Sequence, residues 1–291
     1  MLGKYLSNID GSYMRNNIIA IMYDFDKTLC TRDMQEYTFI PNLGIEPSDF
    51  WNDANKLRED SKMDQVLTYM YLMFRKTIDN NRSLKRKYLN EMGENIELFP
   101  GVIDWFDRIN EYGKSLGIEI EHYIISSGLK EIIEGSKIGD KFKCIYASEF
   151  FYNEDGNAMW PKLAVNYTNK TQFLIRINKG ILDISDDNGL NDKMLENDRR
   201  ISTSNMIYIG DGYTDVPCMK LTKQNGGVSI AVYTDKTCDM AKKLLSDGRI
   251  NYMVKSDYTD GSEIDRIVKK TIESMAIDTE LKNITYKQVN E

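Results

Sequence analysis

Runs of consecutive apolar and β-branched residues recur along the chain, each followed by a more polar segment. Such runs are typical of strands buried on both faces, as in a parallel sheet. Helical patterns between them indicate that strands alternate with helices, which predicts an α/β fold: a three-layer, Rossmann-like core with a mainly parallel sheet. Such a sheet places ligands at the carboxyl ends of its strands. Five strands are predicted, at residues 18–23, 118–126, 144–147, 206–209 and 228–232.

Apolar residues at three- and four-residue spacing predict the helices between these strands. The first stripe precedes the predicted strand at 118–126 and the second follows it. The third stripe precedes the strand at 206–209, and the fourth follows the strand at 228–232. The stripes consist of Val102, Ile103, Phe106, Ile109 and Leu116; of Leu129, Ile132 and Ile133; of Phe173, Leu174 and Ile177; and of Met240, Ala241, Leu244 and Leu245.

Residues 31–97 interrupt the alternation and carry almost no strand signal. An amphipathic helix with a small core of its own is predicted by the spacing of Val66, Leu67, Met70, Tyr71, Phe74 and Ile78. A helical insertion directly after the first strand is well placed to lie over the strand ends. We therefore expect a core of residues 1–30 and 98–291 and an all-helical cap of residues 31–97.

Composition narrows the choice of function. With 38 basic and 45 acidic residues, the formal net charge of −7 offers no basic footprint for nucleic acid, and Lys85-Arg86-Lys87 is typical of a solvated helix face. No stretch reaches the roughly 18 consecutive apolar residues of a membrane span, and residues 1–17 lack the apolar run of a signal peptide. Four dispersed cysteines and one histidine argue against a disulfide framework and a zinc site. We expect a soluble, cytoplasmic protein with no nucleic-acid or membrane partner.

Two other features have structural interpretations. His122 heads an apolar run, so a buried structural histidine is expected and acid–base chemistry would fall to carboxylates. Residues 181–205 are polar and predict a solvent-exposed insertion. The segment Asp186-Asp187-Asn188-Gly189 within it could suggest a calcium loop, but its spacing does not match an EF-hand.

Polar residues follow three of the predicted strands. Asp24 and Asp26 end the first, where buried carboxylates are costly unless they bind hydrogen-bond donors, a metal or a substrate. Ser126-Ser127-Gly128 ends the second and could offer hydroxyl and N–H groups to a phosphate. For each segment alone, the alternative is an ordinary helix cap.

The third strand is followed by Gly210-Asp211-Gly212, with Asp215 four residues after Asp211. Oxygen ligands such as these carboxylates suit Mg²⁺, although a simple tight turn is the alternative. Lys170 opens the helix before this strand, where a lysine opposes the helix dipole, so a ligand role is expected. The coincidence of these groups at strand ends favours phosphoryl-transfer chemistry.

The motifs also resemble a known family. Their order is similar to that of the four motifs of the haloacid dehalogenase superfamily of hydrolases, and residues 31–97 resemble its helical cap. Residues 147–156 resemble the hairpin segment of the phosphoserine-phosphatase-like members. The residues that carry the first resemblance are Asp24, Asp26, Thr28, Ser126, Lys170, Gly210, Asp211, Gly212 and Asp215.

The resemblance implies a Mg²⁺-dependent phosphatase for a small phosphomonoester. Asp24 would attack phosphorus and form an aspartyl-phosphate, and Asp26 would act as the general acid and base. The metal would bind the Asp24 side chain, the Asp26 backbone carbonyl and Asp211, with Asp215 in support. The substrate phosphate would be held by Thr28, Ser126, Ser127, Gly128 and Lys170.

Some alternatives remain open. A phosphotransferase or mutase could use the same residues, and so could a non-catalytic phospho-acceptor. Many family members have glycine where this chain has Lys27, so the backbone there is expected to suit an ordinary L-residue. An amino-acid substrate could bind Asp33 and Glu36 with Arg58 or Arg75, but surface salt bridges are the favoured interpretation of these charges. The sequence does not indicate the oligomeric state.

Overall fold

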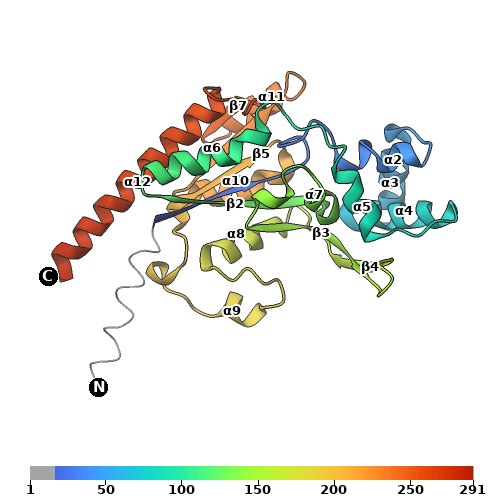
Figure 1. The fold of residues 1–291 in the computed structure, drawn as a ribbon, viewed down its shortest axis with the longest axis horizontal. Coiled ribbons are helices and arrows are strands. Elements are labelled where there is room, and N and C mark those ends of the chain that lie inside the picture. Colours follow the sequence, from blue (N-terminus) through green and yellow to red (C-terminus); the bar gives the residue numbers. More distant parts are fainter. Residues whose placement is uncertain (1–16, 291) are drawn as a thin grey trace. The chain divides into compact units, whose positions relative to one another are not determined.

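The computed structural model describes residues 17–290 and contains a seven-stranded sheet in this range, in the order β4-β3-β2-β1-β5-β6-β7 (Figure 1). The β2–β3, β5–β6 and β6–β7 pairs are parallel, whereas β3 and β4 are antiparallel. The predicted α/β architecture with a mainly parallel sheet is therefore confirmed. The strands are β1 (Ile18–Tyr23), β2 (Glu119–Leu129), β3 (Cys144–Tyr152), β4 (Ala158–Leu163), β5 (Met206–Gly210), β6 (Val228–Tyr233) and β7 (Tyr252–Lys255).

All five predicted strands are present, but the predicted number was too small because β4 and β7 were missed. Pro161 lies inside β4, and a proline within a run argues against a strand unless the strand lies at an edge. β4 is such an edge strand, and it forms the hairpin with β3 that the resemblance implied over 147–156. β7 has only four residues, which is too short for a clear pattern.

The helices fall between and after the strands. They are α2 (Phe39–Asn42), α3 (Pro47–Ser61), α4 (Gln65–Asp79), α5 (Arg86–Gly93), α6 (Val102–Ser115), α7 (Lys130–Glu134), α8 (Lys170–Lys179), α9 (Asp187–Asn191), α10 (Val216–Gln224), α11 (Cys238–Ser246) and α12 (Glu263–Asn290), with short 3₁₀ turns that include η3 (Met34–Glu36) and η7 (Tyr213–Asp215). Within the described part of the chain, no helix combines the length and the apolarity that a membrane span requires.

The chain divides into two compact units. Unit 1 takes in the chain up to Met22, residues 100–122 and residues 171–291, and unit 2 takes in residues 23–99 and 123–170. The strands β1 and β2 each supply residues to both units. The cap over residues 31–97 stays a prediction. The expectation that residues 1–17 form no signal peptide also stays one, because residues 1–16 lie outside the described part of the chain.

Unit 1 is built from parallel strands with helices on both faces. α6 packs with α12 on one face, and α8 and α10 lie on the other (Figure 1). The core side of α6 consists of Val102, Trp105, Phe106 and Ile109. The predicted stripes were partly wrong, because Ile103 is 52% exposed, Leu116 40% and Leu245 41%.

The polar insertion in unit 1 is organised around one buried cation. The Arg176 guanidinium donates to the carbonyl oxygens of Asp183, Ile184 and Asp186 at 2.7 to 3.3 Å. Asp186 accepts from the Gly189 N–H at 2.7 Å and so caps α9. The predicted exposed insertion is thus a folded loop, and its Asp186 serves as a helix cap.

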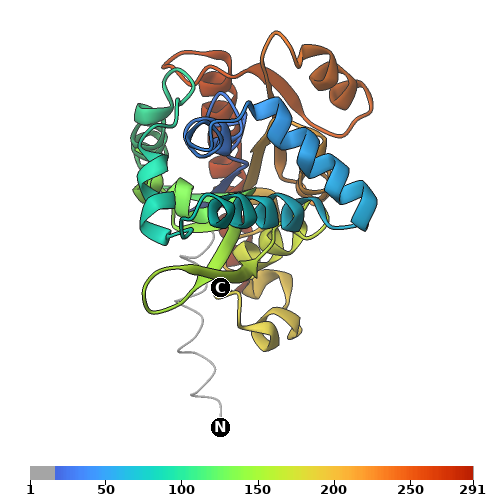
Figure 2. The ribbon, with the colours of Figure 1, turned by 90° about the vertical axis from the view of Figure 1, so that its right-hand side faces the viewer.

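Unit 2 contains the helices α3, α4 and α5 and the β3–β4 hairpin (Figure 2). Asp64 caps α4 by accepting from the N–H groups of Val66 and Leu67. The buried face of α4 includes Val66, Tyr69, Met70 and Met73. The predicted stripe mixed two faces of this helix, because Leu67, Tyr71 and Ile78 are exposed.

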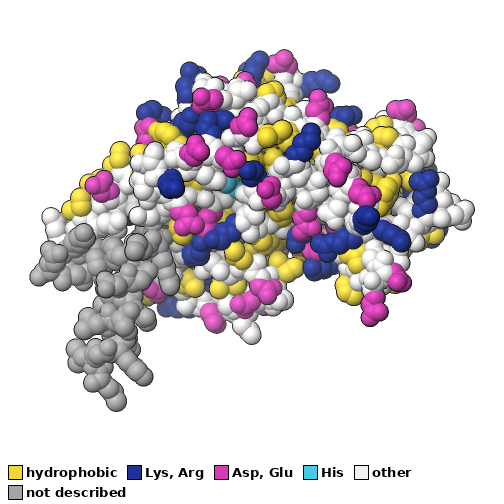
Figure 3. All heavy atoms as spheres, viewed as in Figure 1, with side chains coloured by type: hydrophobic (Ala, Val, Ile, Leu, Met, Phe, Trp, Pro, Cys, Tyr) yellow, Lys and Arg dark blue, Asp and Glu magenta, His cyan; other side chains and the backbone are white. Residues whose placement is uncertain are grey.

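On the surface shown in Figure 3, Lys and Arg side chains lie among Asp and Glu side chains and form no continuous basic area. Charges of both signs on this face are in keeping with the 38 basic and 45 acidic residues of the chain.

His122 is buried in unit 1, as expected. Its Nε2 lies 3.1 Å from Asn110 Oδ1, to which the neutral ring donates, and the ring packs edge-on against Phe106. Burial lowers the pKa of His122 from 6.5 to about 3. The unfolded chain therefore binds more protons than the folded chain between these pH values, and stability falls as the pH drops through this window.

We expect this histidine to cost the fold about 2 kcal/mol of unfolding free energy between pH 7.5 and pH 5. Urea unfolding of the wild type and of His122→Gln at both pH values measures the difference, since glutamine keeps a donor for Asn110 but does not titrate. An identical pH dependence in the two proteins would contradict this origin.

Candidate active site

The turn after β1 places Asp24 and Asp26 in unit 2. Asp24 directly follows the strand and is 6% exposed. The chain then folds back, because the carbonyl oxygen of Phe25 accepts from the N–H groups of Thr28, Leu29 and Cys30 at 2.9 to 3.3 Å. This turn buries the Thr28 side chain completely.

The backbone of this turn corrects one expectation. Lys27 has a φ of +58°, in the left-handed region, so position 27 does not suit an ordinary L-residue. A residue with a Cβ in this conformation costs roughly 1–2 kcal/mol relative to glycine. The Lys27 side chain forms an ion pair with Asp33 at 2.6 Å. Because this pair is partly exposed to solvent, it offsets only part of the cost of the left-handed backbone.

Asp24 is paired with Lys170 inside unit 2. Lys170 Nζ donates to Asp24 Oδ1 at 2.9 Å, and Lys170 is only 1% exposed. The loop before α8 fixes the lysine backbone, since the Lys170 N–H donates to the carbonyl oxygen of Asn166. A buried charge pair of this kind is a costly arrangement for stability alone, which favours a functional role for the pair.

Asp26 is held by the segment that follows the turn. Its Oδ1 accepts from the Met34 N–H at 2.8 Å, and the Cys30 thiol lies 3.7 Å from the same oxygen. Burial raises the pKa of Asp26 well above its usual value, and the charges of Asp33 and Asp24 add to this effect. A raised pKa is what a carboxyl group needs to donate a proton near neutral pH.

The end of β2 forms the second part of the arrangement in unit 2. The pairing of β2 with β3 is irregular between Ile125 and Leu129, so residues 126–128 leave the regular ladder. The Ser126 hydroxyl accepts from the Gly128 N–H at 3.0 Å. The carbonyl oxygen of Ser127 accepts from the hydroxyls of Tyr69 on α4 at 2.6 Å and Ser148 on β3 at 3.1 Å.

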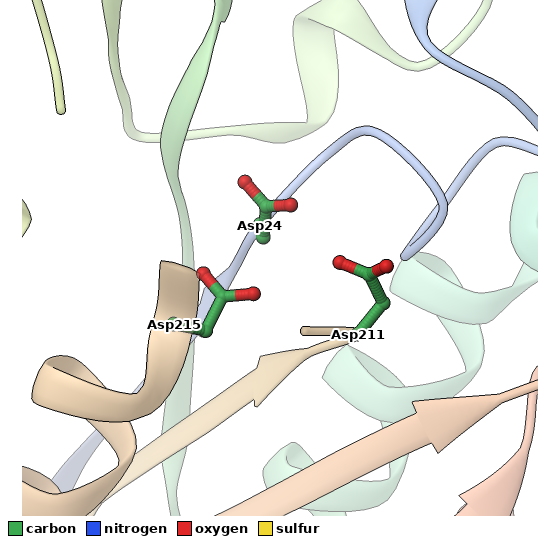
Figure 4. Close-up of side chains that lie close together, drawn as sticks. All are labelled: Asp24, Asp211 and Asp215. Carbon is green, nitrogen blue, oxygen red and sulfur yellow. The ribbon is translucent and has the colours of Figure 1, made fainter. Parts of the chain in front are cut away.

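Asp211 and Asp215 belong to unit 1. Figure 4 shows the elements that carry the three labelled aspartates: Asp24 directly after β1, Asp211 after β5, and Asp215 at the end of η7, directly before α10. Asp215 is fully buried and accepts from the Tyr208 hydroxyl at 2.8 Å. A Cβ at position 210 would lie 2.5 Å from Asp215 Oδ2, so only glycine fits beside this carboxylate.

The structure therefore groups the candidate residues by unit. Unit 2 holds the two aspartates of the first turn, the serine-rich turn and the lysine: Asp24, Asp26, Thr28, Ser126, Ser127, Gly128 and Lys170. Unit 1 holds Asp211 and Asp215. All carboxylate donors in this set are hard oxygen ligands, which fit Mg²⁺.

Sequence reasoning missed several residues that support the turns. Met34, Cys30, Tyr69 and Ser148 all contact them, but a methionine, a cysteine and single hydroxyls give no sequence signal for such a role.

The charges weighed for an amino-acid substrate form local pairs. Asp33 binds Lys27, Glu36 accepts from Trp51 Nε1 at 2.8 Å, Arg58 lies near Glu59, and Arg75 pairs with Asp79. These contacts agree with the interpretation as ordinary salt bridges and hydrogen bonds.

Comparison with known proteins identifies the family. The model for haloacid dehalogenase-like hydrolases matches residues 21–220. An uncharacterized protein of Borreliella burgdorferi is 30% identical, with 86% of this chain and 95% of that protein covered.

Solved structures share the fold. A haloacid dehalogenase family hydrolase from Salmonella enterica serovar Typhi is 18% identical, with a TM-score of 0.56 and coverage of 85% of this chain and 72% of that one. A phosphoserine phosphatase, in a structure described as a phospho-aspartyl intermediate analogue, is 15% identical, with a TM-score of 0.51 and coverage of 87% and 98%. Given the family match over residues 21–220, the chain belongs to the haloacid dehalogenase-like hydrolase family.

Proposed function

We propose that the protein is a Mg²⁺-dependent phosphatase that hydrolyses a small phosphomonoester through an aspartyl-phosphate on Asp24. The observation that carries the proposal is the buried pair of Asp24 and Lys170, 2.9 Å apart and next to Asp26, whose pKa is raised. A phosphatase of this class needs a nucleophile, a fixed positive charge for the phosphoryl oxygens and a proton donor for the leaving alcohol.

Each of these roles falls to one residue of unit 2. Asp24 attacks phosphorus, and the bond to the leaving oxygen breaks. Lys170 keeps the carboxylate oriented and stabilises the negative charge of the transferring group. Asp26 gives its proton to the leaving oxygen and then removes one from the water that hydrolyses the aspartyl-phosphate.

The turn after β2 is proposed to bind the phosphate. Its Ser126 hydroxyl and backbone N–H groups, together with the Thr28 side chain, are suitable donors for phosphoryl oxygens. The two hydroxyls that hold the carbonyl of Ser127 stabilise the turn in one conformation. Such preorganisation favours the transition state because no donor has to reorient during the reaction.

Mg²⁺ is the proposed cofactor, with Asp24, the Asp26 backbone carbonyl and Asp211 as ligands. The donor set consists only of oxygens, and the hydroxyl of Tyr208 fixes Asp215, which would support this shell. When bound, the cation would neutralise charge on the phosphoryl oxygens. Family membership supports the same chemistry, as does the likeness to a phosphoserine phosphatase that was solved as a phospho-aspartyl intermediate analogue.

The proposal also covers the cellular compartment and the role of the helical segment. The four cysteines, all within the described residues, form no disulfide bond, as is usual for proteins of a reducing compartment such as the cytoplasm. The helices of residues 31–97 are proposed as the cap that excludes water and selects the leaving group.

The direct test is the hydrolysis of 4-nitrophenyl phosphate by purified protein, followed as phosphate release. We expect steady multiple turnover with millimolar Mg²⁺, loss of at least about 100-fold after EDTA treatment, and recovery when Mg²⁺ is restored. Undiminished activity in EDTA, or a single turnover only, would contradict the proposal. Added alcohols or sugars that accept the phosphate would instead support a phosphotransferase.

A further inference from the structure

Met34, the first residue of η3, contacts both turns of the candidate site within unit 2. It is 1% exposed and lies eight residues after Asp26. No sequence motif includes it, and none of the proposed roles uses it.

The backbone of Met34 is committed to Asp26. Its N–H donates to Asp26 Oδ1 at 2.8 Å. This N–H is free to do so because it stands at the start of η3, where the first N–H groups have no partner inside the helix. The same turn of chain is closed by the Glu36 N–H, which donates to the carbonyl oxygen of Asp33.

The side chain of Met34 is committed to the other turn. Its sulfur lies 3.0 Å from the Leu129 nitrogen and accepts from that N–H. Its terminal methyl fills the space beside Gly128, where a Cβ would lie only 2.1 Å away. The same Cβ position is 3.0 Å from Asp26 Oδ2, so the carboxyl group, the methionine and the glycine form one packed contact.

We infer that Met34 is a positioning residue that couples the Asp26 carboxyl group to the turn of residues 126–129. The inference rests on the proposed function, since it assigns Asp26 to the leaving group and the turn to the phosphate. One residue fixes the distance between the two, because its N–H holds the proton donor while its side chain packs against the phosphate turn. Met34 itself touches neither the leaving oxygen nor the phosphate.

The test separates the N–H from the side chain. Met34→Pro removes both, whereas Met34→Ala removes only the side chain. Proline suits this position, because Asp33 has an extended backbone with ψ of 132° and Met34 opens a helical turn. Thermal unfolding and circular dichroism of each variant report on folding, and Met73→Ala, also fully buried in unit 2, serves as the control for a lost methionine side chain.

The readout is kcat/KM for two substrates that differ in their need for a proton donor. Phenyl phosphate needs a proton on its leaving oxygen, whereas 4-nitrophenyl phosphate releases a stable anion. We expect Met34→Pro to lose about 100-fold relative to Met34→Ala with phenyl phosphate and less than about 5-fold with 4-nitrophenyl phosphate, since general acid catalysis contributes about 10²- to 10⁴-fold. In the Asp26→Asn background, Met34→Pro should cause no further discrimination between the substrates.

Equal losses with both substrates, or equal values for Met34→Pro and Met34→Ala, would overturn the inference while leaving the phosphatase proposal intact. The phosphatase proposal is tested separately by the wild type, and it would fail if the wild type turned over neither substrate. If Met34→Pro does not fold, variants of the side chain alone provide the test. Met34→Ala should weaken inhibition by inorganic phosphate about 10-fold. Met34→Leu, which restores the side-chain volume, should recover the inhibition. Unchanged inhibition in Met34→Ala would then overturn the inference.

Discussion

Asp24→Asn is expected to lower kcat by on the order of 10⁴-fold or more, because the amide cannot attack phosphorus. The substitution keeps the size of the side chain and an oxygen that can accept from Lys170 Nζ. The buried Lys170 ammonium loses its anionic partner, so some loss of stability is expected. Thermal unfolding of the variant checks that the assay is run on folded protein, so that the loss of rate reports on chemistry. Stopped assays of phosphate release over hours would measure the residual rate.

Asp155→Asn is the matched control for this variant. Asp155 is an exposed aspartate in the loop of the β3–β4 hairpin, also in unit 2, and its replacement makes the same chemical change. Its activity should stay within about twofold of the wild type. Near-full activity of Asp24→Asn would show that another group is the nucleophile.

Lys170→Met is expected to lower kcat by about 10²- to 10³-fold, since it removes a fixed donor from the place where negative charge collects. It should also destabilise the protein by about 3–5 kcal/mol, because the Asp24 carboxylate then lies buried without its cationic partner. Denaturant unfolding measures the second effect. Adding Asp24→Asn to this variant should restore part of the lost stability, since the uncompensated charge is then gone.

Lys162→Met provides the comparison. Lys162 also forms a lysine–carboxylate contact in unit 2, with Glu149 at 3.0 Å, but its side chain is 45% exposed. An ion pair in this setting contributes at most about 1 kcal/mol, so activity and stability should change little. If the two lysine variants behaved alike, the buried pair with Asp24 would have no special role.

Much of the fold was predictable because buried parallel strands have an unmistakable composition. The strand at Ile18–Tyr23 is buried at every position, and its unbroken apolar run shows this directly. The edge strand β4 lacks such a signal, because Pro161 and the exposed Met159 and Trp160 suit its position at the edge but resemble a loop in sequence. Edge strands often carry residues such as proline that prevent pairing with strands of other molecules, so their sequences are poor indicators of strand structure.

For the candidate site, the sequence allowed prediction only of the charged and hydroxyl-bearing residues, because their chemistry can be recognised from residue type. Asp24 and Lys170, 146 positions apart in the sequence, were each predicted as site residues from their own motifs, but their direct pairing was not predicted. The left-handed backbone of Lys27 was not predictable, since a lysine normally avoids it. Contacts made by Met34 depend on an N–H group and on packing beside Gly128, and neither is encoded by residue type alone.

The discontinuous make-up of the two units has a consequence for synthesis on the ribosome. Every residue of unit 2 has been translated once Lys170 has been added, while β5, β6, β7 and α12 of unit 1 are still to be made. Domains tend to fold as soon as their residues are available. Unit 2 can therefore acquire its Asp24–Lys170 pair during translation. By contrast, β1 is made early but must wait for β5, its neighbour in the sheet, which is synthesised much later.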